Sequence, residues 1–156
     1  MPTPRLVLAS TSPFRRELLD RLGLAYDTAA PDIDESRLPD ETAAALVMRL
    51  AEAKARAVAQ DFEGALIIGS DQVATLDGDI LGKPGTHERA VEQLRRASGR
   101  TLVFHTGLCL LRSRDGQARC IEEPFEVKFR GLSDAQIQAY VAREQPLHTG
   151  VSFKAE

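Results

Sequence analysis

An early alternation of short apolar runs with helix-start signals constrains the fold more than any other feature of this sequence. Residues 5–9 form a short apolar run that is typical of a buried strand. Ser12 and Pro13 follow, and they suit the N-cap and the first position of a helix. A second apolar run, residues 66–70, predicts another buried strand that ends at Asp71. Strands that alternate with helices in this way indicate an α/β fold.

Later segments add antiparallel pairing to this pattern. Further strands are expected at about residues 26–29, 101–111 and 117–129, and Asp77-Gly78 predicts a hairpin within residues 73–81. Helices are expected at about 13–22, 42–59, 86–97 and 133–143, of which the third is capped by Thr86 and the last opens with a capping box at residues 133–136. The first helix should bury a stripe of Leu18, Leu19 and Leu22 and end at Gly23. The strand at 101–111 should bury one face made of Leu102, Phe104, Leu108 and Leu110. We therefore expect an α/β or α+β fold with a mixed sheet, in one domain spanning residues 1–156 with two lobes.

Composition narrows the class of protein. The chain has 156 residues, 43% apolar and 28% charged, which is typical of a soluble globular domain. Its net charge of −3 disfavours a partner that is a nucleic acid polymer. No apolar run approaches the ~20 residues that span a bilayer, so no membrane partner is expected. With no secretory signal visible, we expect a cytoplasmic protein. Cys109 and Cys120 flank a predicted hairpin and could lie near each other across it, and without a sign of secretion we expect free thiols rather than a disulfide. The sequence has no Cys/His cluster with zinc spacing.

The first strand-to-helix turn is a candidate anion site. Ser10, Thr11 and Ser12 offer hydroxyl and backbone N–H groups at the positive end of a helix dipole. Arg15 and Arg16 oppose that dipole at a cost of ~0.3–1 kcal/mol each when exposed, and a bound phosphate would offset the cost. The alternative interpretation is a well-capped, solvated helix start, and the spacing favours neither.

A second group of charged residues could hold a metal and phosphates. Asp71 follows a buried strand, which is where open α/β sheets place ligands, and it could bind a cation or take a proton from water. Glu35, beside Asp34, adds a carboxylate, and Lys54 and Lys83 add cations. The plainer alternative is that Asp71 ends the strand and that each of the others is a solvated surface charge.

The motifs resemble a known family when they are taken together. They are Leu8–Leu19, Asp34-Glu35, the helix with Lys54, Gly69–Gln72, Gly82–Pro84 and Pro146–His148. Their order is that of the Maf family of nucleoside triphosphate pyrophosphatases, and the resemblance covers essentially the whole chain. It implies an elongated fold with a cleft between two lobes. The chain ends at Glu156, where the family continues, so we expect a closing strand and helix to be missing.

The resemblance also implies roles for individual residues. Asp71 would be the catalytic proton acceptor, and Glu35 and Asp71 would hold Mg²⁺ or Mn²⁺. The residues implied to bind the substrate are Ser10, Phe14, Arg15, Glu35, Lys54, Gln72, Lys83 and Glu156. A homodimer is a further expectation, because many enzymes of this kind are dimers.

Three positions resemble the subgroup that hydrolyses 7-methyl-GTP. Phe14 stands where the dTTP/UTP subgroup has Arg, and Gln72 and Glu156 also fit the 7-methyl-GTP subgroup. A methylated guanine ring is cationic, so an aromatic face and a carboxylate suit it. Two alternatives stay open: a dTTP/UTP pyrophosphatase of the same family, or a non-catalytic nucleotide-binding regulator linked to septum formation.

Overall fold

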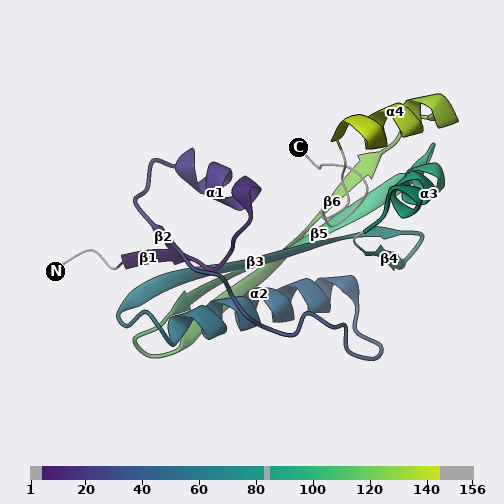
Figure 1. Ribbon diagram of the computed structural model, residues 1–156. Coiled ribbons are helices and arrows are strands. Elements are labelled where there is room, and N and C mark those ends of the chain that lie inside the picture. The colour runs from purple at the N-terminus through teal and green to yellow at the C-terminus, as the bar shows by residue number, and fades with distance from the viewer. Residues whose placement is uncertain (1–4, 83–84, 145–156) are drawn as a thin grey trace. The chain divides into compact units, whose positions relative to one another are not determined.

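The computed structural model describes residues 5–82 and 85–144, and the side chains of Phe14 and Glu144 are excepted (Figure 1). Its strands are β1 (Arg5–Leu8), β2 (Asp27–Thr28), β3 (Ala65–Leu76), β4 (Asp79–Leu81), β5 (Thr101–Arg112) and β6 (Gln117–Lys128). Its helices are α1 (Pro13–Asp20), α2 (Ala43–Ala59), α3 (His87–Ala97) and α4 (Asp134–Glu144). The strands form one sheet in the order β2-β1-β3-β5-β6, and β4 pairs with β3. β1 is parallel to β2 and β3, whereas β3 and β4 are antiparallel, so the predicted mixed α/β sheet is confirmed.

The described residues divide into two compact units, and each has its own core. The first unit comprises residues 5–71 and 106–123, with α2 against the sheet. Its main cluster of buried side chains is Val7, Ala9, Ala51, Ala55, Val58, Ala65, Ile67, Cys109 and Leu111. Because the members come from β1, α2, β3 and β5, this core holds together segments that are distant in the sequence.

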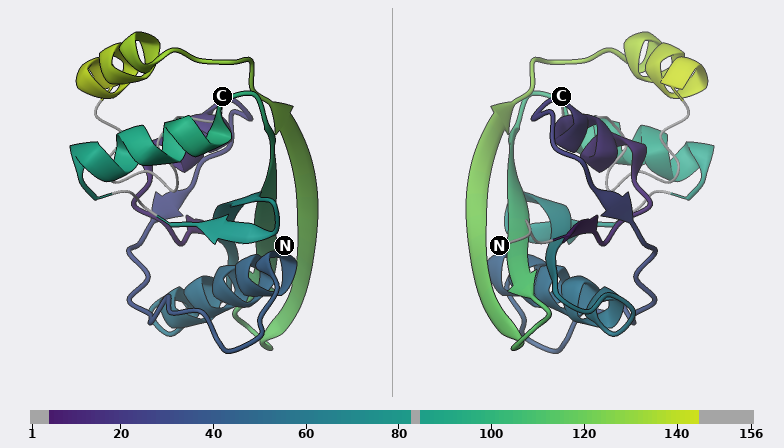
Figure 2. Two further views of the ribbon diagram at one scale, coloured as in Figure 1. Left: turned by 90° about the vertical axis from the view of Figure 1, so that its right-hand side faces the viewer. Right: turned by 90° about the vertical axis from the view of Figure 1, so that its left-hand side faces the viewer.

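The second unit comprises residues 72–105 and 124–144, without 83–84. Its helices α3 and α4 lie side by side (Figure 2). Its buried cluster is Ala74, Leu76, Leu81, Ala90, Val91, Leu94, Ala97, Leu102, Phe104, Ile137 and Val141. Every member is apolar, so burial of hydrocarbon is the main source of stability in this unit.

Helix starts and turns lie where the local sequence predicts them. Thr42 and Thr86 cap α2 and α3, and each hydroxyl oxygen accepts a backbone N–H bond of 3.2 Å. Ser133 and Gln136 form a complete capping box at α4, with bonds of 3.0 and 3.2 Å. Asp77 and Gly78 both have positive φ in the turn between β3 and β4, as a tight hairpin requires. These contacts are local, which is why short sequence patterns predict them.

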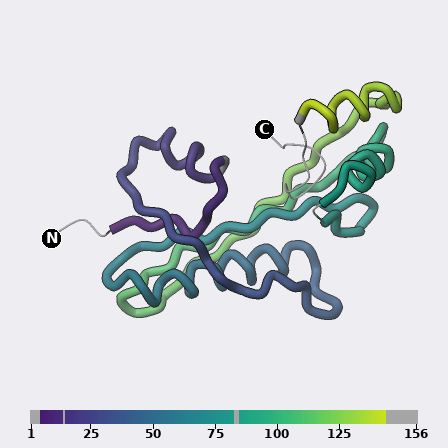
Figure 3. The backbone as a smooth tube through the Cα atoms, viewed as in Figure 1, coloured from purple at the N-terminus to yellow at the C-terminus, as the bar shows by residue number. Residues whose placement is uncertain are grey.

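The prediction that the central strand ends at Asp71 is wrong. β3 runs without a break from Ala65 to Leu76, as the backbone trace shows (Figure 3). The strand continues because Ala74–Leu76 pair with β4 and because Ala74 and Leu76 enter the core of the second unit. Asp71 is therefore an interior strand residue rather than the end of a strand.

The prediction of one continuous buried face on β5 is also wrong. Leu102 and Phe104 are buried as expected, but Leu108 and Leu110 are 41% and 44% exposed. The buried residues further along β5 are Gly107, Cys109 and Leu111. The change from even to odd numbers falls at the boundary between the units, because each half of the strand packs into a different core.

α1 is shorter and less buried than predicted. It ends at Asp20, and the chain then tightens through bonds from Leu22 N to Leu19 O and from Gly23 N to Asp20 O. Leu19 is buried, but Leu18 and Leu22 are exposed among the described residues. The expected apolar stripe is therefore reduced to one residue.

Cys109 and Cys120 are free thiols, as predicted. Among the described helices, none is long and apolar enough to cross a membrane.

Candidate functional site

A buried ion pair between α2 and β3 is the centre of the candidate site. Lys54 Nζ lies 3.1 Å from Asp71 Oδ1 and 2.9 Å from Glu35 Oε1. Lys54 is only 7% exposed and Asp71 9%, whereas the side chain of Glu35 is half exposed. Charges this far from solvent are rare unless they are paired, and loss of one partner leaves a costly unpaired charge. The structure thus brings together three of the residues that were predicted from the sequence.

Gly69 explains how α2 comes close enough to make this pair. A Cβ built at Gly69 would lie 1.9 Å from the carbonyl oxygen of Ala51, so any side chain here would push the helix away from β3. Gly107 on β5 has the same function, since its Cβ would lie 2.2 Å from Val47 O. Lys54 follows Ala51 by about one helical turn and therefore reaches the strand near Asp71.

The turn after β1 lies beside the same stretch of β3. Leu8 pairs with Ile68 in parallel register, and Ala9 N donates to Ile68 O at 2.9 Å. Ser10 comes next and is buried, and its Oγ accepts a bond of 3.0 Å from Ser12 N. This bond uses a lone pair and leaves the hydroxyl proton of Ser10 able to donate. Ser12 occupies the N-cap position as predicted, but its side chain makes no capping bond.

Arg15 adds a second cation near the ion pair. Burial lowers the pKa of Arg15 from its ordinary value, and the carboxylates of Asp71 and Glu35 oppose that shift. Arginine nonetheless stays protonated in proteins at neutral pH. The carboxylates of Asp71 and Glu35 both act on the pKa of Arg15, so the guanidinium lies within electrostatic reach of the same charge cluster. An anion would therefore meet a partly desolvated guanidinium at this point.

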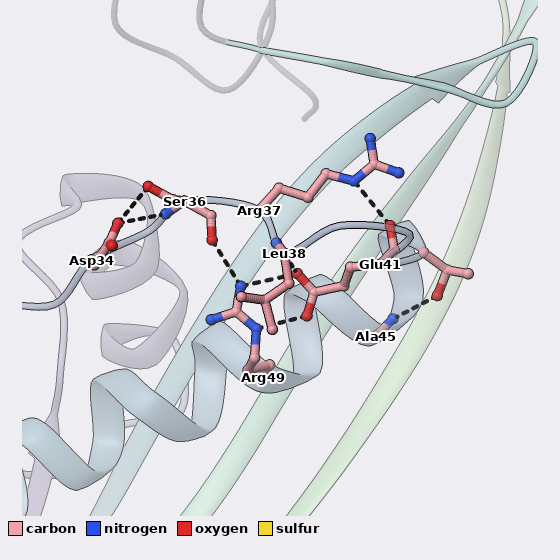
Figure 4. A network of polar contacts seen from close by, with 8 residues as sticks. Asp34, Ser36, Arg37, Leu38, Glu41, Ala45 and Arg49 are labelled. Atoms are coloured by element: carbon pink, nitrogen blue, oxygen red, sulfur yellow. Dashed lines mark hydrogen bonds and ion pairs between the residues drawn. The ribbon is translucent and has the colours of Figure 1, made fainter.

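Arg49 holds the loop that carries Glu35, and the sequence analysis missed it (Figure 4). Its guanidinium bonds both carboxylate oxygens of Glu41, at 2.6 and 2.9 Å, and the carbonyl oxygen of Ser36 at 2.9 Å. The hydrogen bond to Glu41 raises the pKa of Arg49 and lowers that of Glu41. Within the loop, hydrogen bonds from Ser36 lower the pKa of Asp34. The available clue was an arginine on a helix that follows an acidic loop, which is too common a pattern to single out Arg49.

The contacts described above do not include four of the predicted site residues. Gln72 follows Asp71 in β3, but it is exposed and belongs to the second unit. The side chain of Phe14, in α1, is not among the described groups. Lys83 and Glu156 lie outside the described residues. Their roles stay predictions.

The donor set fits a hard divalent cation. Glu35 and Asp71 both approach the same ammonium group, so their carboxylates converge on one region. Carboxylate oxygens are the ligands that Mg²⁺ and Mn²⁺ prefer. The side chain of Glu35 is half exposed, so a cation from solvent can reach its carboxylate.

Comparison with known proteins identifies the family. Residues 5–156 match the family described as Maf-like protein, and the chain belongs to this family. A 7-methyl-GTP pyrophosphatase from Nitrosococcus oceani is 57% identical over 153 residues, covering 98% of this chain and 77% of the relative. A 7-methyl-GTP pyrophosphatase from Alcanivorax borkumensis is 54% identical over 154 residues, covering 99% of this chain and 78% of the relative.

Proposed function

We propose that this protein hydrolyses 7-methyl-GTP to 7-methyl-GMP and pyrophosphate, and so removes a modified nucleotide from the cytoplasmic pool. The observation that carries the proposal is the buried Asp71–Lys54 pair in a chain more than half identical to proteins named 7-methyl-GTP pyrophosphatase. A carboxylate and an ammonium group held together away from solvent suit a reaction that needs both a proton acceptor and a phosphate ligand.

In the proposed reaction, Asp71 accepts a proton from a water molecule. The water oxygen forms a bond to the α-phosphorus, the bond from that phosphorus to the bridging oxygen breaks, and pyrophosphate leaves. Ser10, Arg15, Lys54 and Lys83 would hold the phosphate oxygens. Since phosphoryl transfer depends mainly on positioning and charge stabilisation, fixed cations are a large part of what a protein can contribute.

The proposal includes a divalent cation, Mg²⁺ or Mn²⁺, held by Glu35 and Asp71. When bound, such an ion neutralises phosphate oxygens and polarises the phosphorus centre. Arg49 would support this role indirectly, because it anchors the loop from Ser36 to Glu41 that follows Glu35.

Base selection is assigned to Phe14, Gln72 and Glu156. An aromatic ring against the cationic 7-methylguanine is worth ~0.5–2 kcal/mol, or roughly 2- to 30-fold in preference over an unmethylated purine. We expect Phe14→Arg to reduce kcat/KM for 7-methyl-GTP by at least this factor while pyrimidine triphosphates hold or improve. A uniform loss for all substrates, together with a lower melting temperature, would show that Phe14 is structural.

The direct test is product analysis with 7-methyl-GTP and a divalent cation. We expect 7-methyl-GMP and pyrophosphate in equal amounts, and a loss of about 10²–10⁴-fold in kcat for Asp71→Asn with most nucleotide binding retained. Asp61→Asn, which changes an exposed carboxylate at the end of α2, is the matched control and should not alter the rate. Release of orthophosphate alone would overturn the reaction. Binding without turnover would instead support a nucleotide-sensing regulator, and a preference for dTTP or UTP would overturn the assigned substrate.

A further inference from the structure

A second cluster of ligand-type side chains lies in the first unit, and the proposed reaction does not use it. Its members are Glu52 on α2, Cys109 on β5 and Cys120 on β6. One ligand atom from each residue lies within 4.8 Å of the others. Cys109 is fully buried, whereas the other two residues are only partly buried, so solvent can reach the group from the side of Glu52.

One distance within the cluster matches a tetrahedral metal site. Zinc binds thiolate sulfur at about 2.3 Å and carboxylate oxygen at about 2.0–2.2 Å, so a sulfur and an oxygen on one tetrahedral ion lie about 3.5 Å apart. The distance from Cys120 Sγ to Glu52 Oε1 is 3.5 Å. The pair therefore has the separation that a tetrahedral ion needs.

A neighbouring arginine fixes the orientation of the carboxylate. Arg56 Nε bonds the other oxygen of Glu52 at 3.1 Å, and Arg56 also donates to Gly116 O at 3.3 Å. Hydrogen-bonded partners of this kind orient the ligands of natural metal sites. The charges also balance, because two thiolates, one carboxylate and a divalent ion carry a net charge of −1, which the arginine offsets.

We propose that Glu52, Cys109 and Cys120 form a binding site for a thiophilic divalent cation such as Zn²⁺, with one coordination position left for water. Two soft sulfur donors select such an ion over Mg²⁺. Because the ligands come from α2, β5 and β6, the bound ion fastens the β5–β6 hairpin to the helix. The site is independent of the proposed nucleotide reaction and is tested without nucleotide.

Co²⁺ is the first probe, with the whole chain kept reduced by a phosphine. One equivalent of Co²⁺ should give the charge-transfer absorption of cobalt–thiolate bonds, and Zn²⁺ should displace it. Cys120→Ser should abolish this absorption. Glu52→Gln should weaken Co²⁺ binding at least about 10-fold, the lower limit even for loss of an outer-shell group. Glu63→Gln, which changes an exposed carboxylate between α2 and β3, is the matched control and should bind normally.

Thermal unfolding supplies the second measurement. Zn²⁺ should raise the melting temperature of the protein and of Glu63→Gln, and a chelator should reverse the shift. Cys120→Ser should unfold at the same temperature with and without Zn²⁺. Two outcomes overturn the proposal: no cobalt–thiolate absorption at one equivalent, or an equal Zn²⁺ response in Cys120→Ser.

Discussion

The two units differ in the kind of side chain that they bury. The first unit buries the polar side chains of Ser10, Lys54 and Asp71, and no buried side-chain polar atom in the described residues lacks a hydrogen bond. The core of the second unit is wholly apolar. Hydrocarbon packing contributes stability directly, whereas buried ion pairs contribute little net stability and are strongly destabilising when one partner is removed. The first unit therefore holds the buried charges of the proposed reaction, whereas the second unit, which contains Gln72, has an apolar core.

The units also differ in how their helices contact the sheet. α2 touches β3 and β5 through backbone atoms opposite Gly69 and Gly107. α3 and α4 instead contribute side chains such as Leu94 and Ile137 to their core. A backbone contact tolerates no added atom, whereas a side-chain core responds mainly to lost volume. We therefore expect the stability of the first unit to fall when a larger residue replaces one of these glycines, and the stability of the second unit to fall when a smaller residue replaces a core side chain.

The largest effect is expected from breaking the ion pair of the first unit. Lys54→Met removes the cation and leaves Asp71 buried with its charge unpaired, which should cost about 3–5 kcal/mol in the free energy of unfolding. Urea unfolding measures this loss, and turnover of 7-methyl-GTP should fall as well. The double variant Lys54→Met/Asp71→Asn should regain part of the stability. Equal stability of the single and double variants would contradict the unpaired charge of Asp71 as the source of the loss.

Removal of volume from the second unit should affect stability alone. Ile137 is almost fully buried in α4, and Ile137→Ala should cost about 2–5 kcal/mol. Because α4 carries none of the residues assigned to the reaction or to base selection, kcat per folded molecule should be unchanged at a temperature where the variant is folded. If kcat falls by more than the loss of folded protein, the core of the second unit affects the reaction as well as stability, and the prediction is contradicted.

Added volume should damage the first unit. Gly69→Ala places a methyl group against the Ala51 carbonyl, and we expect a loss of about 1–3 kcal/mol together with lower activity as Lys54 moves. Gly131→Ala is the matched control, because its Cβ meets nothing within 4 Å and its backbone needs no positive φ. Similar melting temperatures for both variants would contradict the proposed close contact.

The smallest effect concerns an exposed charge in the β5–β6 turn. Hydrogen bonds from Arg112 and from the backbone N–H of Gln117 lower the pKa of Asp115 from 3.8 to about 2. A carboxylate with a lowered folded-state pKa stabilises the protein above pH 4, and this contribution disappears as the pH falls through about 2. Asp115→Asn should therefore be slightly less stable than the parent at pH 7, and the difference should vanish near pH 2.

The sequence predicts features that depend on neighbouring residues. The caps at Thr42, Thr86 and Ser133 and the Asp77-Gly78 turn each follow from a few adjacent side chains. The course of β3 through Asp71 was missed because a charged residue inside a strand resembles a strand end. Its burial depends on Lys54, which reaches it only through the close approach of α2 at Gly69.

The buried face of β5 was missed for a related reason. Leu108 and Leu110 are as apolar as Leu102, and only the tertiary structure determines which of them meets a core. The roles of individual site residues were proposed from family resemblance and stay predictions. The Arg49–Glu41 pair was missed because it joins residues on a loop and a helix that no periodic pattern relates. Contacts between elements therefore set the limit of prediction from this sequence.

The contact of α2 with Gly69 and Gly107 also has a mechanical consequence. Side chains can change rotamer and so act as a compliant layer between a helix and a sheet, but no such layer separates Val47 and Ala51 from these glycines. Val47 and Ala51 are about one turn apart, so backbone atoms of two successive turns of α2 contact the sheet directly. The Lys54 ammonium can therefore shift relative to Asp71 only if the Lys54 side chain changes rotamer or the backbone of α2 is displaced. In this way α2 restricts the position of the charge that it carries.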